Sequence, residues 1–451
     1  MASAAEQLAA NMNFASFQKA TELHKRIWFT IIALVVFRLG TYVPIPGINP
    51  EAFANAFAGQ SQGILGMFNM FSGGAVERMA IFSLNVMPYI SASIIVQLMG
   101  SVYPPWEKLK KEGGEAGRKT LNQYTRYLAV VLAIVQSFSI AVGLHSQPGL
   151  VFEGISAPFF IASTVVALTG GTLFLMWLGE QITSRGVGNG VSLIIFAGIV
   201  AGLPRGIGQL LVQSQTSGNY LPLFVIMLLA VAAVWAIVFI ERSQRRLLVH
   251  YPKRQQGNRM IGGDTSFMPL KINTAGVIPP IFASSLLLLP TTAMGFLSTA
   301  TLPAWAGWLP GTVGALQHGQ PAFMLMYAGL IIFFSFFYTS VVFNPDETAE
   351  NLRKYGGFLP GIRPGKRTAE YLDYVLTRLT VIGAAYITAV CLIPELMMTA
   401  LGATQFALGG TSVLIVVTVT MDTVAQIQSQ LLAHQYEGLI KKSKLRGGKG
   451  R

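Results

Sequence analysis

Residues 63–100, GILGMFNMFSGGAVERMAIFSLNVMPYISASIIVQLMG, combine a short apolar stretch with a long one. The long part, 79–99, is sufficient to cross the ~30 Å hydrocarbon core of a bilayer. The short part, 63–71, covers about two helical turns and ends at Ser-Gly-Gly, a sequence that breaks a helix. A short apolar helix beside a full span lies either in the membrane interface or in a re-entrant position sheltered by protein. In a channel, a re-entrant segment of this kind is a stopper.

The composition predicts an all-α protein that crosses a membrane many times. Of the 451 residues, 52% are hydrophobic and 11% are charged, whereas soluble domains average about 25% charged residues. The N-terminus is polar and has no cleavage-site pattern after an apolar core, so we expect no removable signal peptide. Length and hydropathy predict ten spans, at 27–44, 79–100, 127–145, 158–178, 191–211, 221–240, 273–293, 322–343, 377–398 and 406–426.

The basic residues predict the orientation of these spans. Twenty-nine of the 32 lysines and arginines lie in the N-terminal segment, in the loops after spans two, four, six and eight, and in the C-terminal tail. The exceptions are Arg38, Arg78 and Arg205. By the positive-inside rule, both termini are cytoplasmic. The net charge of +13 therefore describes one face of the protein.

Ten spans divide into two groups of five, and an odd number per group requires inverted repeats. We therefore expect two halves of opposite orientation, joined by a hinge loop. The predicted units are a cytoplasmic segment (1–26), a first half (27–211), a hinge loop (212–220), a second half (221–426) and a basic cytoplasmic tail (427–451).

The sequence lacks the motifs of an enzyme. It contains no HExxH, no GxSxG, no P-loop lysine and no paired aspartates within the spans, and its five histidines show no metal-ligand spacing. We therefore expect neither catalysis nor a cofactor. Ionisable residues that a proton-coupled transporter would need lie near span ends or off centre, which favours snorkelling or interhelical pairs. These residues are Arg38, Glu180, Arg205, Arg378, Glu395 and Asp422. A small-solute secondary transporter with inverted repeats remains the alternative function, and a structural scaffold is a third.

Two cytoplasmic loops, 241–272 and 344–376, are long and basic. A solvated positive-inside face explains most of their charge, but a docking surface for ribosomal RNA or an acidic protein is the functional interpretation. In GIRPG at 361–365, glycine and proline on both sides fix a turn that presents Arg363. Arg363 is therefore the predicted docking residue with the most specific context.

The chain closely resembles the SecY family of protein-conducting channels, called Sec61 alpha in eukaryotes, in its bacterial branch. The resemblance extends from the first span to the tenth. The matching stretches are FRLGTYVPIPGI (37–48), MFNMFSGGA (67–75), MPYISASIIVQL (87–98), QYTRY (123–127), LMWLGEQITSRGVGNGVSLIIFAGIVAGLP (175–204), KRQQG (253–257), AGVIPPIFASS (275–285), FFYTSVVFNP (336–345), GIRPG (361–365), TRLT (377–380) and GGTSVLIVV (409–417).

This resemblance implies an hourglass channel with a plug, a ring of aliphatic residues at the constriction and a lateral gate between spans two and seven and spans three and eight. Residues 63–74 correspond to the plug, with its core at Met67, Phe68, Asn69, Met70, Phe71, Ser72, Gly73 and Gly74. The ring positions correspond to Val86, Ile90, Ile195, Ile281 and Ile415. For each of these aliphatic residues alone, helix packing would be the simpler explanation.

Gln97 and Gln136 are candidates for a polar latch across the gate, and ordinary interhelical hydrogen bonding is an equally good account of both. Pro279 and Pro280, next to the ring position Ile281, are expected to kink the seventh span.

The resemblance also implies partners and a location. Translocation would be driven by the SecA ATPase or by the ribosome, both docking on the two basic loops. SecE and SecG would be the accompanying subunits, signal peptides and unfolded preproteins the cargo, and membrane lipid the destination of apolar segments. The expected location is the bacterial plasma (inner) membrane. The expected docking residues are Arg245, Arg246, Lys253, Arg254 and Arg363.

Overall fold

The computed structural model describes most of the chain. The described residues are 21–58, 69, 71–111, 114–146, 149–152, 154–218, 220–251, 254–256, 259–261, 265–297, 320–401 and 410–447. The predicted plug residues Met67, Phe68 and Met70 and the predicted docking residue Lys253 lie outside this part of the chain.

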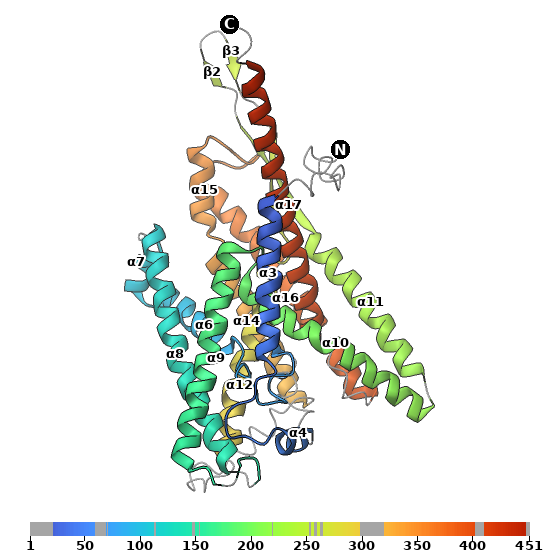
Figure 1. Ribbon diagram of the computed structural model, residues 1–451. Coiled ribbons are helices and arrows are strands. Elements are labelled where there is room, and N and C mark those ends of the chain that lie inside the picture. Colours follow the sequence, from blue (N-terminus) through green and yellow to red (C-terminus); the bar gives the residue numbers. More distant parts are fainter. Residues whose placement is uncertain are drawn as a thin grey trace.

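Within the described residues, a helix coincides with each of the ten predicted spans (Figure 1). These helices are α3 (Thr21–Gly40), α6 (Met87–Val102), α8 (Gly114–Ser146), α9 (Ala157–Arg185), α10 (Gly190–Ser217), α11 (Leu221–Arg242), α12 (Ile278–Leu297), α14 (Pro321–Val342), α16 (Lys366–Leu401) and α17 (Gly410–Gly447). Seven segments of the described chain are helical, long and apolar enough to cross a bilayer; they correspond to α8, α9, α10, α11, α14, α16 and α17. The apolar helices at α6 and α12 are shorter, and α3 carries the basic residues Lys25, Arg26 and Arg38. The chain is therefore a multi-pass membrane protein.

The helix of the second span begins later than predicted, at Met87 rather than residue 79. Residues 80–86 form successive turns, in which the N–H groups of Ser83 and Asn85 donate to carbonyls three residues earlier. Met79 and Asn85 have left-handed backbones, with φ of 45° and 49°, which a helix cannot accommodate. Pro88 then occupies the first helical turn, where its missing N–H has no cost. An apolar composition alone could not distinguish these buried turns from a helix.

The seventh span shows the same feature, because α12 begins at Ile278. Pro279 and Pro280 therefore lie in its first turn, where a proline neither removes an intrahelical hydrogen bond nor clashes with a preceding carbonyl. The kink predicted from these two prolines is wrong for this reason.

The connection between α10 and α11 is also shorter than the predicted hinge loop 212–220. Helix α10 continues to Ser217, and Gly218, with φ of 65°, ends it in a left-handed cap. Helix α11 begins three residues later, at Leu221. Residues 212–217 thus belong to a helix, and the loop is confined to the residues that follow.

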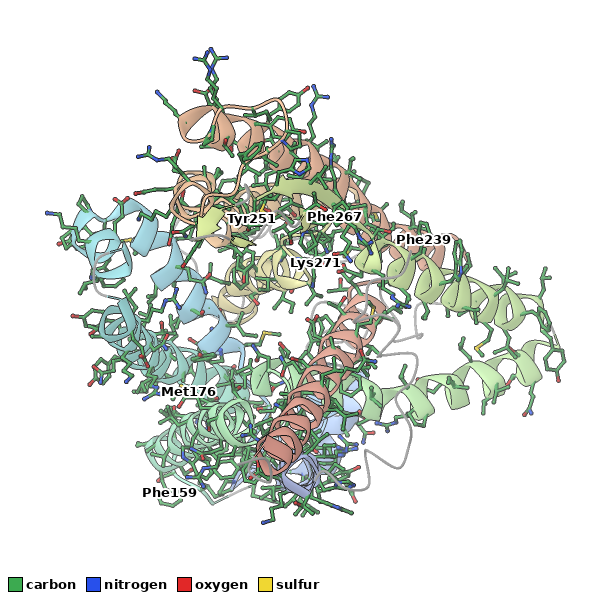
Figure 2. All side chains as sticks on the ribbon, turned by 90° about the horizontal axis from the view of Figure 1, so that it is seen from above. Phe159, Met176, Phe239, Tyr251, Phe267 and Lys271 are labelled. Carbon is green, nitrogen blue, oxygen red and sulfur yellow. The ribbon has the colours of Figure 1, made fainter. Side chains whose placement is uncertain are left out.

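The helices form two groups that meet along two sides. In the first group, α9 packs against α8, α10 and α3, and α8 packs against α6; in the second, α14 packs against α12 and α16, and α17 against α16 and α11. Between the groups, α12 packs against α6 and α8, while α10 packs against α17 and α11. Seen from above, α10 and α11 extend away from the other helices on one side (Figure 2).

Short helices and strands lie at the two ends of the long helices. Helix α7 (Pro104–Lys111), helix α15 (Pro345–Lys354) and the strands lie toward one end, and α4 (Pro50–Ala58) lies toward the other (Figure 1). Strand β1 (Gln244–His250) pairs antiparallel with β4 (Thr265–Lys271), and β2 (Arg254–Gln256) pairs with β3 (Arg259–Ile261). The all-α expectation did not include these strands. The tail is not a separate unit up to Gly447, since α17 continues through it.

Candidate pore, gate and docking surface

The five residues predicted to form the ring come together from four helices. Val86 directly precedes α6, Ile90 lies in its first turn, and Ile195, Ile281 and Ile415 come from α10, α12 and α17. Four are buried, with at most 6% of their surface exposed, and Ile281 is half-buried against the same hydrophobic cluster. Sequence positions more than 300 residues apart thus meet in one apolar layer.

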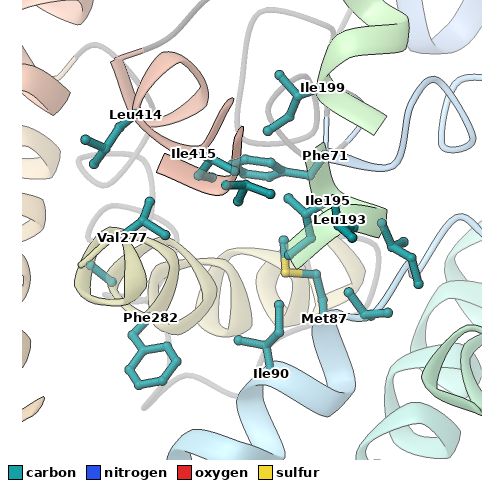
Figure 3. Packing of buried hydrophobic residues seen from close by; sticks show 14 of the residues in the cluster. Phe71, Met87, Ile90, Leu193, Ile195, Ile199, Val277, Phe282, Leu414 and Ile415 are labelled. Carbon is teal, nitrogen blue, oxygen red and sulfur yellow. The ribbon is translucent and has the colours of Figure 1, made fainter. Parts of the chain in front are cut away.

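The end of the predicted plug is buried in this layer. Phe71 is 4% exposed and belongs to the same hydrophobic cluster as the ring residues. In Figure 3 its ring lies next to Ile415, with Ile199 above it and Ile195 below it. The aromatic side chain therefore fills space that the aliphatic residues alone would leave open.

The main chain of the plug end lies against α10. At Gly198, an added Cβ would overlap the carbonyl oxygen of Phe71 and lie 3.2 Å from the amide nitrogen of Gly73. Only glycine allows this close approach. The last two residues of the predicted plug, Gly73 and Gly74, have φ of 69° and 85°, which permits a sharp turn of the chain after the plug.

Two polar side chains bind the carbonyls of this exit. The Asn85 amide donates to the carbonyl oxygen of Phe71 at 2.7 Å, and the Arg38 guanidinium donates to that of Gly73. Asn85 is 1% exposed, so its amide replaces water as the partner of a buried carbonyl. Arg38 also donates to the Tyr42 hydroxyl at 3.0 Å. Sequence reasoning gave neither Asn85 nor Arg38 a role in the plug, although a polar Asn within an apolar run and an arginine within a span were available signals.

The helices assigned to the lateral gate are in contact. Helix α12 packs against both α6 and α8, and the Ser285 hydroxyl of α12 donates to the Met87 sulfur of α6 at 3.6 Å. Gln97 donates through its side-chain nitrogen to the Ser93 hydroxyl of its own helix at 3.1 Å. Gln136 is half-buried on α8. A polar latch between the two glutamines thus stays a hypothesis.

The two basic loops form one packed unit. His250 of β1 and Phe358, which follows α15, exchange backbone hydrogen bonds of 2.9 and 3.0 Å. Beneath them, Leu247 and Val249 of β1 share a buried cluster with Leu372 of α16. The predicted docking residues lie on this unit: Arg245 and Arg246 are exposed on β1, Arg254 is on β2 and Arg363 is exposed between α15 and α16. Figure 2 shows Tyr251 and Phe267 in the same region.

Three of the ionisable residues near span ends, Glu180, Arg205 and Arg378, make close contacts within the protein. Arg126 of α8 and Glu180 of α9 form an ion pair of 2.8 Å, and Arg205 pairs with Glu77 at 2.7 Å. Arg378 lies over the ring of Tyr374. These contacts agree with the interpretation of such residues as local pairs, and they give no support to a proton relay.

An apolar layer where membrane helices meet, with the end of the predicted plug buried in it, is the arrangement expected of a helical membrane channel. The SecY family profile matches residues 80–424. Among curated relatives, a protein translocase subunit SecY from Pseudomonas aeruginosa is 52% identical over 434 residues and covers 95% of both chains. Its counterpart from Escherichia coli K12 is 52% identical over 428 residues, which are 94% of this chain and 96% of the relative. The chain belongs to the SecY family.

Solved structures of low sequence identity share the fold. "The structure of a protein conducting channel" has a TM-score of 0.62 at 17% identity, with coverage of 90% of this chain and 92% of the other. "Sec61 in the Canine ribosome-channel complex from the endoplasmic reticulum" has a TM-score of 0.60 with the same identity and coverage. The architecture is therefore that of the channels in both structures.

Proposed function

We propose that this chain forms the pore of a protein-conducting channel that passes unfolded secretory chains outward and releases apolar segments sideways into the membrane. Family membership makes it a non-enzymatic channel subunit. The observation that supports the rest is the burial of Phe71, a residue of the predicted plug, in the same hydrophobic cluster as the predicted ring residues and next to Ile415 and Ile195.

The ring would act as a seal that does not select among side chains. Branched aliphatic residues make a constriction that excludes water and so blocks ions. They offer neither a charge nor a hydrogen bond to a passing polypeptide, so the constriction can part around any sequence. The plug end would close the remaining space in the resting state and leave when a chain enters.

The contact of α12 with α6 and α8 supports a lateral gate at this place. A signal peptide or transmembrane segment would pass between these helices to reach lipid, because its apolar surface is more stable in hydrocarbon than in a water-filled pore. On the other side of the molecule, the short connection between α10 and α11 would be the hinge between two inverted halves.

Energy for translocation would come from partners at the packed unit of the two basic loops. The exposed arginines Arg245 and Arg363, together with Arg254 of β2, suit the phosphates of ribosomal RNA or an acidic face of the SecA ATPase. SecE and SecG would complete the complex. The concentration of basic residues at this end supports a cytoplasmic position for it and for both termini, in a bacterial inner membrane.

Ion conductance of the purified complex in planar bilayers tests the channel itself. We expect the intact protein to be silent and a variant lacking residues 63–74 to open repeatedly. Silence of both proteins, including with a translocating chain arrested inside, would contradict the channel and bring back the small-solute transporter, which saturable uptake of a small molecule would then support.

Docking is tested by Arg363→Glu in an export assay driven by SecA. The reversed charge should repel an acidic partner and lower export while leaving the conductance of the plug-deleted channel unchanged. Arg185→Glu, an exposed cytoplasmic arginine outside the two loops, is the matched control. Unchanged export in Arg363→Glu would contradict the assignment of Arg363 as a docking residue.

A further inference from the structure

Glu77, three residues after the plug, connects the plug to α10. Its carboxylate accepts hydrogen bonds from the Arg205 guanidinium at 2.7 Å and from the Asn69 side-chain amide at 3.4 Å. The contact with Asn69 is reciprocal, because the Glu77 backbone N–H donates to the Asn69 side-chain oxygen at 2.9 Å. Asn69 lies within the plug and Arg205 within α10, so Glu77 bridges a segment expected to move and a helix expected to stay.

Asn69 also organises the exit of the plug. Its backbone carbonyl accepts from the Gly74 N–H at 2.8 Å and from the Ser72 hydroxyl at 3.0 Å. Hydrogen bonds thus connect Asn69 to Ser72, Gly74 and Glu77 in one compact turn. Any force on Glu77 is transmitted to this turn as a unit, rather than to one side chain.

Helix α10 meets the plug through one of its faces. Gly198 and Arg205 are seven residues apart, about two turns, and so lie on the same side of the helix. Ile195, a predicted ring residue, precedes Gly198 by three residues and lies on that side as well. The same face thus provides part of the ring, the close contact with the plug main chain and the ionic contact with Glu77.

We propose that Glu77 and Arg205 are positioning residues that latch the plug in the resting channel. This inference rests on the channel function and adds to it an electrostatic connection between the plug and α10. The plug cannot leave the ring with its turn intact unless the Glu77–Arg205 pair breaks, so the pair adds to the free-energy difference between the closed and the open channel.

The Glu77–Arg205 pair should contribute modestly to the stability of the closed channel, and its contribution should decrease as salt increases. The side chains of Arg205 and Glu77 are 60% and 25% exposed, so water and ions screen their attraction. Loss of such a pair should raise the open fraction of the resting channel by about twofold to fivefold. The hydrogen bonds to the carbonyls of Phe71 and Gly73 involve neutral acceptors and are expected to hold the plug with little dependence on salt.

The test compares resting conductance in planar bilayers for the intact protein, Glu77→Gln and Arg205→Gln at low and high salt. Both variants should open more often at low salt, and the difference from the intact protein should shrink at high salt. The exchanged pair, Glu77→Arg with Arg205→Glu, should restore the closed state, which a merely structural role for either residue would not predict.

Glu180→Gln is the matched control, because Glu180 forms an ion pair of similar length and exposure with Arg126, away from the plug. It should leave the conductance unchanged. The latch is wrong if Glu77→Gln and Arg205→Gln behave like the intact protein while the variant lacking residues 63–74 opens. Silence of that deletion variant would instead contradict the channel, so the two failures are distinguishable.

Discussion

Replacement of Gly198 by alanine should open the resting channel, because this glycine is where α10 touches the plug main chain. The added Cβ would overlap the Phe71 carbonyl oxygen and lie 3.1 Å from the carbonyl carbon of that residue. Both atoms belong to the main chain, which cannot rotate away as a flexible side chain can. The plug end or the helix must therefore shift, and Phe71 must leave its position in the ring.

The size of the effect follows from the difference between the two states. An extra methyl group in a well-packed site costs about 1–3 kcal/mol, and this cost applies only when the plug is in place. Alanine also favours a helix over glycine by roughly 0.5–1 kcal/mol, but this gain is present in the closed and in the open channel and cancels. The closed state should lose about 1–3 kcal/mol, a shift of roughly 5–150-fold toward the open channel.

Single-channel recording measures this shift directly, and Gly202→Ala is the matched control. Gly202 lies one turn further along α10, and a Cβ there would meet nothing within 4 Å. We expect frequent openings for Gly198→Ala and none beyond the intact protein for Gly202→Ala. Equal behaviour of the two variants, closed or open, would refute the reasoning, since only one of them contacts the plug.

Three further predictions follow from other parts of the structure. Gly190→Ala should lower stability by about 1–3 kcal/mol, because its Cβ would overlap the Gly179 carbonyl oxygen; Gly170→Ala, with nothing within 4 Å, should not lower the thermal midpoint. Leu372→Ala should destabilise the packed cytoplasmic unit by about 2–5 kcal/mol, seen as faster proteolysis between β1 and β4. Ile90→Ser should raise ion leak through the plug-deleted channel during translocation, as a hydroxyl wets the constriction.

The helices could be predicted from the sequence because a bilayer imposes a minimum length on each apolar run. The exceptions occurred where apolar residues serve another purpose. Residues 79–86 are as hydrophobic as a span, yet they form buried turns beside the plug, and the left-handed backbones at Met79 and Asn85 distinguish them from a helix. Apolar residues are selected by a lipid environment and equally by a buried protein environment, and residues 79–86 are apolar because protein surrounds them.

The β1–β4 pairing was missed for a different reason. The basic residues of QRRLLVH at 244–250 were interpreted as part of a charged loop, but from Arg246 to His250 the buried Leu247 and Val249 alternate with exposed or half-buried residues. Pairing with β4 provides hydrogen-bond partners for the backbone of β1, and the side chains of Leu247 and Val249 are buried against α16. The sequence did not indicate that the two basic loops contact each other, because their backbone pairing through His250 and Phe358 joins residues more than 100 positions apart.

The plug could be located in the sequence by resemblance to a family, but the residues that hold it could not be predicted from their side-chain types. Arg38 and Asn85 donate to backbone carbonyls, and Gly198 is used for the space that its missing side chain leaves. The partners of Arg38 and Asn85 in the plug are main-chain carbonyls, and a Cβ at Gly73 would lie 2.9 Å from the Arg38 guanidinium and 3.1 Å from the Gly198 Cα, so these contacts need a glycine at position 73. Of the plug residues described here, Phe71 alone contributes a large apolar side chain to the ring. A seal held mainly by its backbone can be displaced and reformed without matching side chains one by one, which suits a segment that must leave for every polypeptide that passes.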